Sequence, residues 1–66
     1  MTLLQAILSG NAQAYGRLSD LMRKHGATYY ETHALVCKWH REAGKPEPSL
    51  AEYDEKMMQA DNEAPR

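Results

Sequence analysis

The sequence predicts an all-α protein, on the strength of three observations. Helix-capping motifs occur at three places, apolar residues recur every three or four positions, and nothing alternates with the two-residue period of a strand. In a capping box, a Ser or Thr and a Glu or Gln three residues later satisfy each other's free backbone N–H groups. The three boxes are Thr2 with Gln5, Thr28 with Glu31, and Ser49 with Glu52. We therefore predict three helices, over residues 3–25, 29–43 and 50–60.

The first predicted helix, residues 3–25, carries a row of positions spaced alternately by three and four residues. The row consists of Leu4, Ile7, Asn11, Ala14, Leu18, Leu21 and His25. This heptad spacing makes a narrow face that packs against a nearly parallel second helix, and a polar Asn11 within it fixes register and partner number. We expect a dimer interface formed by Leu4, Ile7, Asn11, Ala14, Leu18 and Leu21.

The weak point of this helix is Ser9-Gly10-Asn11, a triplet typical of turns. The apolar residues before and after the triplet keep one helical phase, and an interior glycine costs a helix only about 1 kcal/mol. We expect the helix to continue through the triplet. A break at this point is the alternative.

The second predicted helix, residues 29–43, forms an antiparallel hairpin with the first, and Trp39 anchors its buried stripe. Its end is indicated by Gly44, Pro46 and Pro48. The third helix, residues 50–60, has the thinner apolar stripe Leu50, Tyr53, Met57 and Ala60. Residues 1–61 are predicted to form one domain, with residues 62–66 as a disordered tail because no large apolar group holds them.

A chain of 66 residues buries a small core, so a further source of stability is expected. Cys37 is the only cysteine, which excludes a disulfide within the chain. Oligomerisation remains, and we expect two hairpins to assemble into a helical-bundle homodimer. No apolar run approaches the roughly 20 residues of a membrane span, and no secretory leader is recognisable, so a cytoplasmic location is expected.

The net charge of −1 conceals a division along the chain. Residues 17–45 carry six basic and three acidic side chains, a balance of +3, whereas residues 46–66 carry two basic and six acidic ones, a balance of −4. An excess of +3 is weak for a nucleic-acid site, where basic residues are more numerous and clustered. An acidic C-terminal third suits a basic partner or the chain's own basic middle.

Three residues of the second helix offer ligand or nucleophile chemistry: His33, Cys37 and His40. Zinc prefers these nitrogen and sulfur ligands, but three ligands along one helix cannot all close on one tetrahedral ion. A Cys–His pair could also activate a thiolate, yet the sequence indicates no substrate cleft. We expect no metal, no cofactor and no enzymatic activity.

The function expected from these features is binding of another protein by a small regulator, an adaptor or inhibitor of the kind found among bacterial and phage accessory factors. Tyr29 and Tyr30 cannot both face inward, and Tyr30 is the one expected outside. The predicted partner-binding residues are Arg23, Lys24, Tyr30, Lys38 and Arg41. The alternative is a dimeric helix-turn-helix DNA-binding regulator, with residues 29–43 as its recognition helix.

Overall fold

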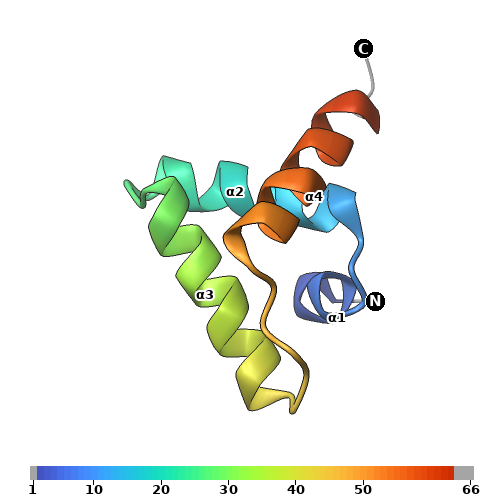
Figure 1. Ribbon diagram of the computed structural model, residues 1–66. Coiled ribbons are helices and arrows are strands. Elements are labelled where there is room, and N and C mark those ends of the chain that lie inside the picture. The colour runs from blue at the N-terminus through green and yellow to red at the C-terminus, as the bar shows by residue number, and fades with distance from the viewer. Residues whose placement is uncertain (1, 64–66) are drawn as a thin grey trace.

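The computed structural model describes residues 2–63, which form four α-helices and no β-strand. The helices are α1 (Leu3–Leu8), α2 (Ala12–Lys24), α3 (Tyr29–Glu42) and α4 (Leu50–Glu63). Figure 1 shows α2 and α3 leaving a common turn, with α4 crossing in front of α2. The all-α prediction is confirmed, and the structure has four helices where the sequence predicted three.

The additional helix arises because the chain breaks at the turn between α1 and α2. Gly10 has a φ of +85°, in the left-handed region that glycine adopts without penalty. Asn11 is the N-cap of α2, and its Oδ1 accepts hydrogen bonds from the backbone N–H groups of Gln13 (2.9 Å) and Ala14 (3.3 Å). The Lys56 Nζ donates to the Gly10 carbonyl at 2.8 Å and fastens α4 to this turn. The prediction of one unbroken helix over residues 3–25 is therefore wrong.

The hydrophobic core lies within one chain and takes side chains from all four helices. Its buried members are Ile7, Ala14, Tyr15, Leu18, Val36 and Tyr53. Partly buried side chains pack around them: Leu3, Ala6, Met22, Leu35, Trp39 and Met57. The apolar side of each helix is thus satisfied mainly by the other helices of the same chain.

The heptad row of the sequence is divided by the break. Its members Ile7, Ala14 and Leu18 are buried in the core, whereas Leu4 and Leu21 are 43% and 47% exposed. Asn11 caps α2 instead of pairing across helices, and His25 is the exposed C-cap of the same helix. The interpretation of the row as one continuous helix face is therefore wrong, and the homodimer stays a prediction.

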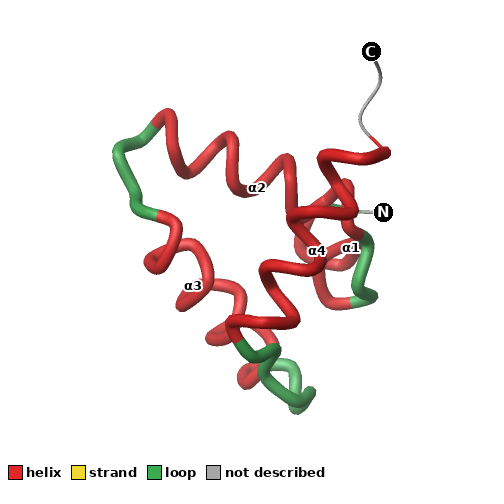
Figure 2. Tube along the Cα trace, turned by 45° about the horizontal axis from the view of Figure 1, so that its top comes forward, coloured by secondary structure: helices red, strands yellow, loops and turns green. Residues whose placement is uncertain are grey.

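Helix α3 begins with the predicted capping box of Thr28 and Glu31, which confirms that helix start. Figures 1 and 2 both show α2 and α3 diverging from their turn, so the predicted antiparallel hairpin is open. The reason is that α1 packs against both helices. The connector after α3 folds back along it, since the Pro48 carbonyl oxygen lies 2.9 Å from His33 Nε2 and 3.4 Å from Cys37 Sγ.

Helix α4 begins with the third predicted capping box, in which the Glu52 N–H donates to Ser49 Oγ at 3.2 Å and the Ser49 N–H donates to Glu52 Oε1 at 3.4 Å. The helix packs mainly on α2 and continues to Glu63, past the predicted end at residue 60. Of the tail predicted over 62–66, residues 62 and 63 are helical, and residues 64–66 lie outside the described residues. None of the helices between residues 2 and 63 combines the length and apolar character needed to cross a membrane.

Candidate functional site

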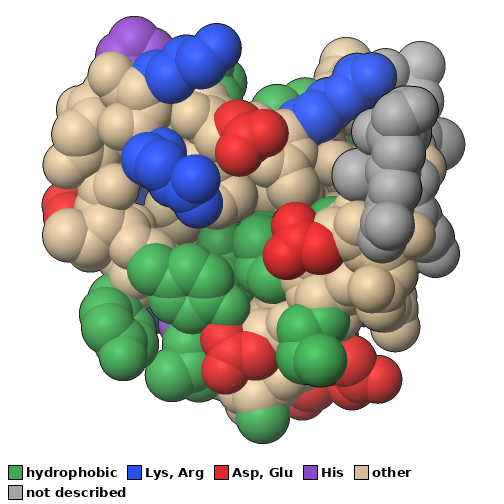
Figure 3. Space-filling view, turned by 90° about the horizontal axis from the view of Figure 1, so that it is seen from above, with side chains coloured by type: hydrophobic (Ala, Val, Ile, Leu, Met, Phe, Trp, Pro, Cys, Tyr) green, Lys and Arg blue, Asp and Glu red, His purple; other side chains and the backbone are tan. Residues whose placement is uncertain are grey.

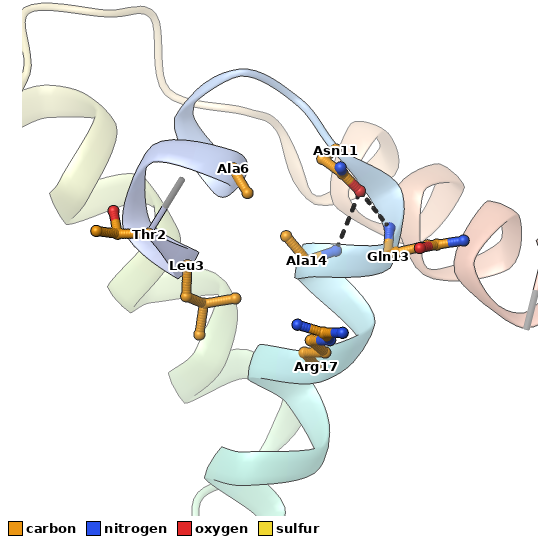
Figure 4. Close-up of a pocket in the computed structure, with 7 residues that line it drawn as sticks. All are labelled: Thr2, Leu3, Ala6, Asn11, Gln13, Ala14 and Arg17. Atoms are coloured by element: carbon orange, nitrogen blue, oxygen red, sulfur yellow. Dashed lines mark hydrogen bonds between the residues drawn. The ribbon is translucent and has the colours of Figure 1, made fainter.

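Three of the surface hollows lie between helices, and the first lies between α1 and α2. It has a volume of about 290 Å³ and is lined by Thr2, Leu3, Ala6, Asn11, Gln13, Ala14 and Arg17 (Figure 4). The amide oxygen of Asn11 is already engaged as the cap of α2, as the dashed lines in Figure 4 show. Arg17 is the one charged residue of this lining.

The second hollow lies between α1 and α3 and has a volume of about 370 Å³. Its lining residues are Leu4, Leu8, Trp39, Glu42 and Ala43. This hollow is mainly apolar, with Glu42 as its one charged lining residue. It therefore offers contact area and little that would select one partner chemistry over another.

The third hollow, which we call the α2–α4 groove, brings together residues of three helices in a volume of about 230 Å³. It is lined by Gly16, Ser19, Asp20 and Arg23 of α2, Tyr29 of α3, and Met57, Ala60 and Asp61 of α4. Unlike the other two hollows, it combines an aromatic ring and a methionine with charged residues of both signs. The α2–α4 groove is therefore the candidate functional site.

The close approach of α2 to α4 in this groove depends on small residues. A Cβ placed on Gly16 would lie 3.1 Å from the Cβ of Ala60, so a larger residue at position 16 would push the helices apart. Ser19 and Ala60 are buried. Gly16 and Met57 are each followed three and four residues later by further lining residues, a spacing that places them on one helix face.

Tyr29 is held in place by contacts on two sides. Its hydroxyl donates a hydrogen bond to the Asp54 carboxylate, and its ring packs against that of Tyr53 with centroids 5.1 Å apart. Burial, followed by the hydrogen bond to Asp54, raises the pKa of Tyr29 above its ordinary value. The hydroxyl therefore remains a neutral donor at physiological pH. Tyr30 touches the other side of the Tyr29 ring edge-on at 6.0 Å and is 69% exposed.

The charged residues of the groove are not neutralised by one another. Asp20, Arg23 and Asp61 are exposed, and the ion pair found within residues 2–63 is elsewhere, between Arg41 and Glu47 at 3.9 Å. Figure 3 shows the molecule from above, where hydrophobic side chains lie among separate acidic and basic ones. Unpaired charges beside an apolar surface are available to a binding partner.

The five residues predicted to bind a partner do not form one site. Arg23 lines the groove, and Tyr30 lies beside it through its contact with Tyr29. Lys24 and Lys38 are exposed and line none of the three hollows, and Arg41 pairs with Glu47 of the connector. The structure thus brings two of the five predicted residues to the candidate site.

The histidine and cysteine residues of α3 face different surroundings. His33 and Cys37 meet at 3.3 Å beside the Pro48 carbonyl, whereas the His40 ring is buried and its Nδ1 lies 2.8 Å from the carbonyl oxygen of Val36. Between residues 2 and 63, no three His, Cys, Asp or Glu residues are grouped so that they could hold a metal ion. Burial, then the nearby Glu47 charge, raises the pKa of the Cys37 thiol, with Arg41 opposing. A protonated thiol is a poor nucleophile.

Most residues of the groove were not predicted as site residues. Tyr29 was expected to face inward, and Met57 and Ala60 were expected in the apolar stripe of the third helix. The groove forms only when residues 16–23 contact residues 57–61, and no local sequence motif predicts that contact. A usable signal was the pair of small residues on facing helices, Gly16 and Ala60, which permits close packing.

Comparisons of this chain with protein-family models, with curated proteins and with solved structures gave no significant match.

Proposed function

We propose that this chain is a small non-enzymatic regulator that binds a partner protein through the α2–α4 groove and the adjacent Tyr30. The observation that carries the proposal is the combination of a fixed ring, Tyr29, with an exposed ring, Tyr30, at the edge of a groove whose charged residues form no ion pair within residues 2–63. Tyrosine, methionine and arginine are enriched in the centres of protein interfaces. Their positions here suit a contact surface.

The size of the groove supports a macromolecular partner over a small molecule. Its volume of about 230 Å³ lies below the roughly 300–1,000 Å³ of typical small-molecule pockets. A side chain projecting from a partner protein fits such a space, while the rest of that protein covers the tyrosines around it. The protonated Cys37 thiol, whose neighbours include a backbone carbonyl, gives no support for nucleophilic catalysis.

The proposal does not require the homodimer expected from the sequence. The residues Ile7, Ala14 and Leu18, which motivated that dimer, belong to the core of a single chain. Nor do we propose DNA binding. The first turn of α3 consists of Tyr29, Tyr30 and Glu31, and none of these is the Arg, Asn or Gln that reads base edges.

Affinity capture with matched variants tests the proposal. The immobilised chain, its Tyr30→Ala variant and its Leu21→Ala variant are each exposed to extract from the cells that make the protein. Leu21 is the matched control, because it is an exposed apolar residue outside the groove. We expect the wild type and Leu21→Ala to retain the same polypeptide and Tyr30→Ala to retain at least about fivefold less, the effect of an interface residue worth about 1 kcal/mol.

Two results would contradict the proposal. The first is a polypeptide retained equally by all three forms, because the tyrosine surface would then not be the binding site. The second is retention of duplex DNA with an affinity that falls steeply with salt, since release of counterions is the mark of nucleic-acid binding.

A further inference from the structure

We infer that the α2–α4 groove receives a lysine or arginine side chain from the partner protein. This inference rests on the proposed function and specifies its partner chemistry. It follows from what lines the groove: small residues between the two helices, the apolar surfaces of Tyr29 and Met57, and the exposed carboxylates of Asp20 and Asp61.

The interior of the groove suits the hydrocarbon part of a basic side chain. Gly16, Ala60 and the buried Ser19 line it without bulky groups, and Tyr29 and Met57 supply apolar surface. Lysine and arginine bury three or four methylene groups along apolar surfaces while their charged ends stay at the edge. The volume of about 230 Å³ is smaller than that of a typical small-molecule pocket.

The rim of the groove suits the charged end. Asp20 on α2 and Asp61 on α4 stand on opposite helices, and neither is in an ion pair with another described residue. The ring of Tyr29 adds a further attraction for a cation, because aromatic rings attract cations over their faces. Its hydroxyl donates a hydrogen bond to the Asp54 carboxylate, which brings a further negative charge close to the ring. Two carboxylates and a ring thus converge on one small space.

Acidic side chains of α4 outside the groove lining make the surface around it more negative. Helix α4 exposes Glu52, Asp54 and Glu55 in addition to Asp61. Its single lysine, Lys56, is engaged by the Gly10 carbonyl at 2.8 Å and so is directed to the α1–α2 turn. An acidic helix beside the groove favours a basic partner surface and repels an acidic one.

Arg23 is the one cation in the lining, and it makes the inference testable in a second direction. It is exposed in the last turn of α2, where the helix dipole favours positive charge. A partner's basic side chain must approach against its repulsion. Removing the charge of Arg23 should therefore strengthen binding of a basic side chain. If Arg23 instead contacts an acidic group of the partner, removing its charge should weaken binding.

The experiment is an NMR titration of the ¹⁵N-labelled chain with blocked tripeptides. The probes are Ac-Ala-Lys-Ala-NH₂ and Ac-Ala-Arg-Ala-NH₂. The control probe replaces lysine with norleucine, which keeps the hydrocarbon chain and removes the charge. We expect saturable shifts of the amides of residues 16–23 and 57–61 with the two basic peptides and none with the control. Equal shifts with norleucine, or shifts spread over the whole chain, would overturn the inference.

Charge variants complete the test. Asp20→Asn with Asp61→Asn should lower the association constant for the lysine peptide about fivefold, because two surface charge contacts are lost. Arg23→Gln should raise it about twofold, because one repulsion is removed. Glu55→Gln, on the same helix but outside the groove lining, is the matched control and should change little. All four positions are exposed, so the fold is retained.

The outcomes separate this inference from the proposed function. If a cellular partner is captured through Tyr30 but Asp20→Asn with Asp61→Asn binds it as the wild type does, the inference fails and the protein-binding function stands. If the lysine peptide binds the groove while no polypeptide is captured through Tyr30, the proposed function fails and the groove's preference for a cation stands.

Discussion

The four tyrosines of this chain form a row of ring contacts with a buried end and an exposed end. Tyr15 lies 5.8 Å from Tyr53, Tyr53 lies 5.1 Å from Tyr29, and Tyr29 lies 6.0 Å from Tyr30, measured between ring centroids. At the buried end, Tyr15 and Tyr53 are 2% and 0% exposed, and at the other end Tyr30 is 69% exposed. One residue type thus serves in the core at one end of the row and on the surface at the other.

Along the row, the hydroxyl groups of Tyr53 and Tyr29 also differ in their hydrogen bonds. The Tyr53 hydroxyl is buried and has no hydrogen-bond partner among the described residues, so its ring contributes to stability and its oxygen costs some. The Tyr29 hydroxyl, nearer the surface, is paired with Asp54. Tyr53 therefore contributes through packing, while Tyr29 also keeps a hydroxyl group oriented by Asp54.

The largest effect is expected at the buried end. Tyr53→Ala removes a fully buried ring that touches Tyr15, Tyr29 and His33, so the free energy of unfolding should fall by about 3–5 kcal/mol. Such a loss is comparable with the whole stability of a 66-residue domain. Urea unfolding followed by circular dichroism measures it.

Tyr53→Phe is the matched control for that prediction, because it keeps the ring and removes only the unpartnered oxygen. Its free energy of unfolding should equal that of the wild type or exceed it by up to about 1 kcal/mol. A clear loss in this variant would mean that the hydroxyl has a partner, and a small loss in Tyr53→Ala would mean that the ring is not part of the core.

The second largest effect is expected from alkaline pH. Burial is the first cause that raises the pKa values of Tyr15, Tyr29 and Tyr53, and that of Tyr53 reaches about 12. Their neutral forms are favoured in the folded state, so this contribution is complete below pH 10, where unfolded tyrosine stays protonated, and is lost as pH rises toward 12. For the buried Tyr15 and Tyr53, each unit of raised pKa corresponds to about 1.4 kcal/mol, whereas Tyr29 is 37% exposed and contributes less because solvent screens its charge.

Urea midpoints measured between pH 8 and pH 12 give the size of that loss. Tyr53→Phe has one titrating group fewer in the core, so its stability should fall less steeply than that of the wild type above pH 10. Parallel curves for the two proteins would show that the buried end of the row does not govern the alkaline transition.

The sequence predicted the helix starts better than the tertiary arrangement. Thr2, Thr28 and Ser49 each cap a helix as expected, because a capping box is a local set of hydrogen bonds that residues three apart can form by themselves. The break at Gly10 and Asn11 was missed. The apolar phase continues across that turn because α1 and α2 both contribute to one core.

The candidate site was predicted only in part, for a related reason. Tyr30 was expected outside because two adjacent helical residues cannot face the same way, and this geometry is local. The groove itself depends on α4 crossing α2 at Gly16 and Ala60, which are 44 positions apart in the sequence. Spacing within one helix carries no information about which helix lies opposite.

The third prediction concerns the middle of the row. Tyr29→Phe keeps the contact with Tyr53 and removes the hydrogen bond to Asp54, so the free energy of unfolding should fall by about 1 kcal/mol. A double-mutant cycle with Asp54→Ala measures the coupling of the two side chains. Additive effects of the two substitutions would show that the hydroxyl and the carboxylate are independent in solution.

The smallest effect on stability is expected at the exposed end. Tyr30→Ala removes a ring that is mostly in water and touches Tyr29 only by its edge, and alanine favours the helix more than tyrosine does. The lost ring contact and the gained helix propensity oppose each other, so the free energy of unfolding should change by no more than about 0.5 kcal/mol, even though partner capture should fall at least about fivefold. Urea unfolding of the variant measures this change. A loss above 1 kcal/mol would place Tyr30 in the core. The weaker capture by that variant would then reflect a damaged fold, and the row would have no end available for recognition.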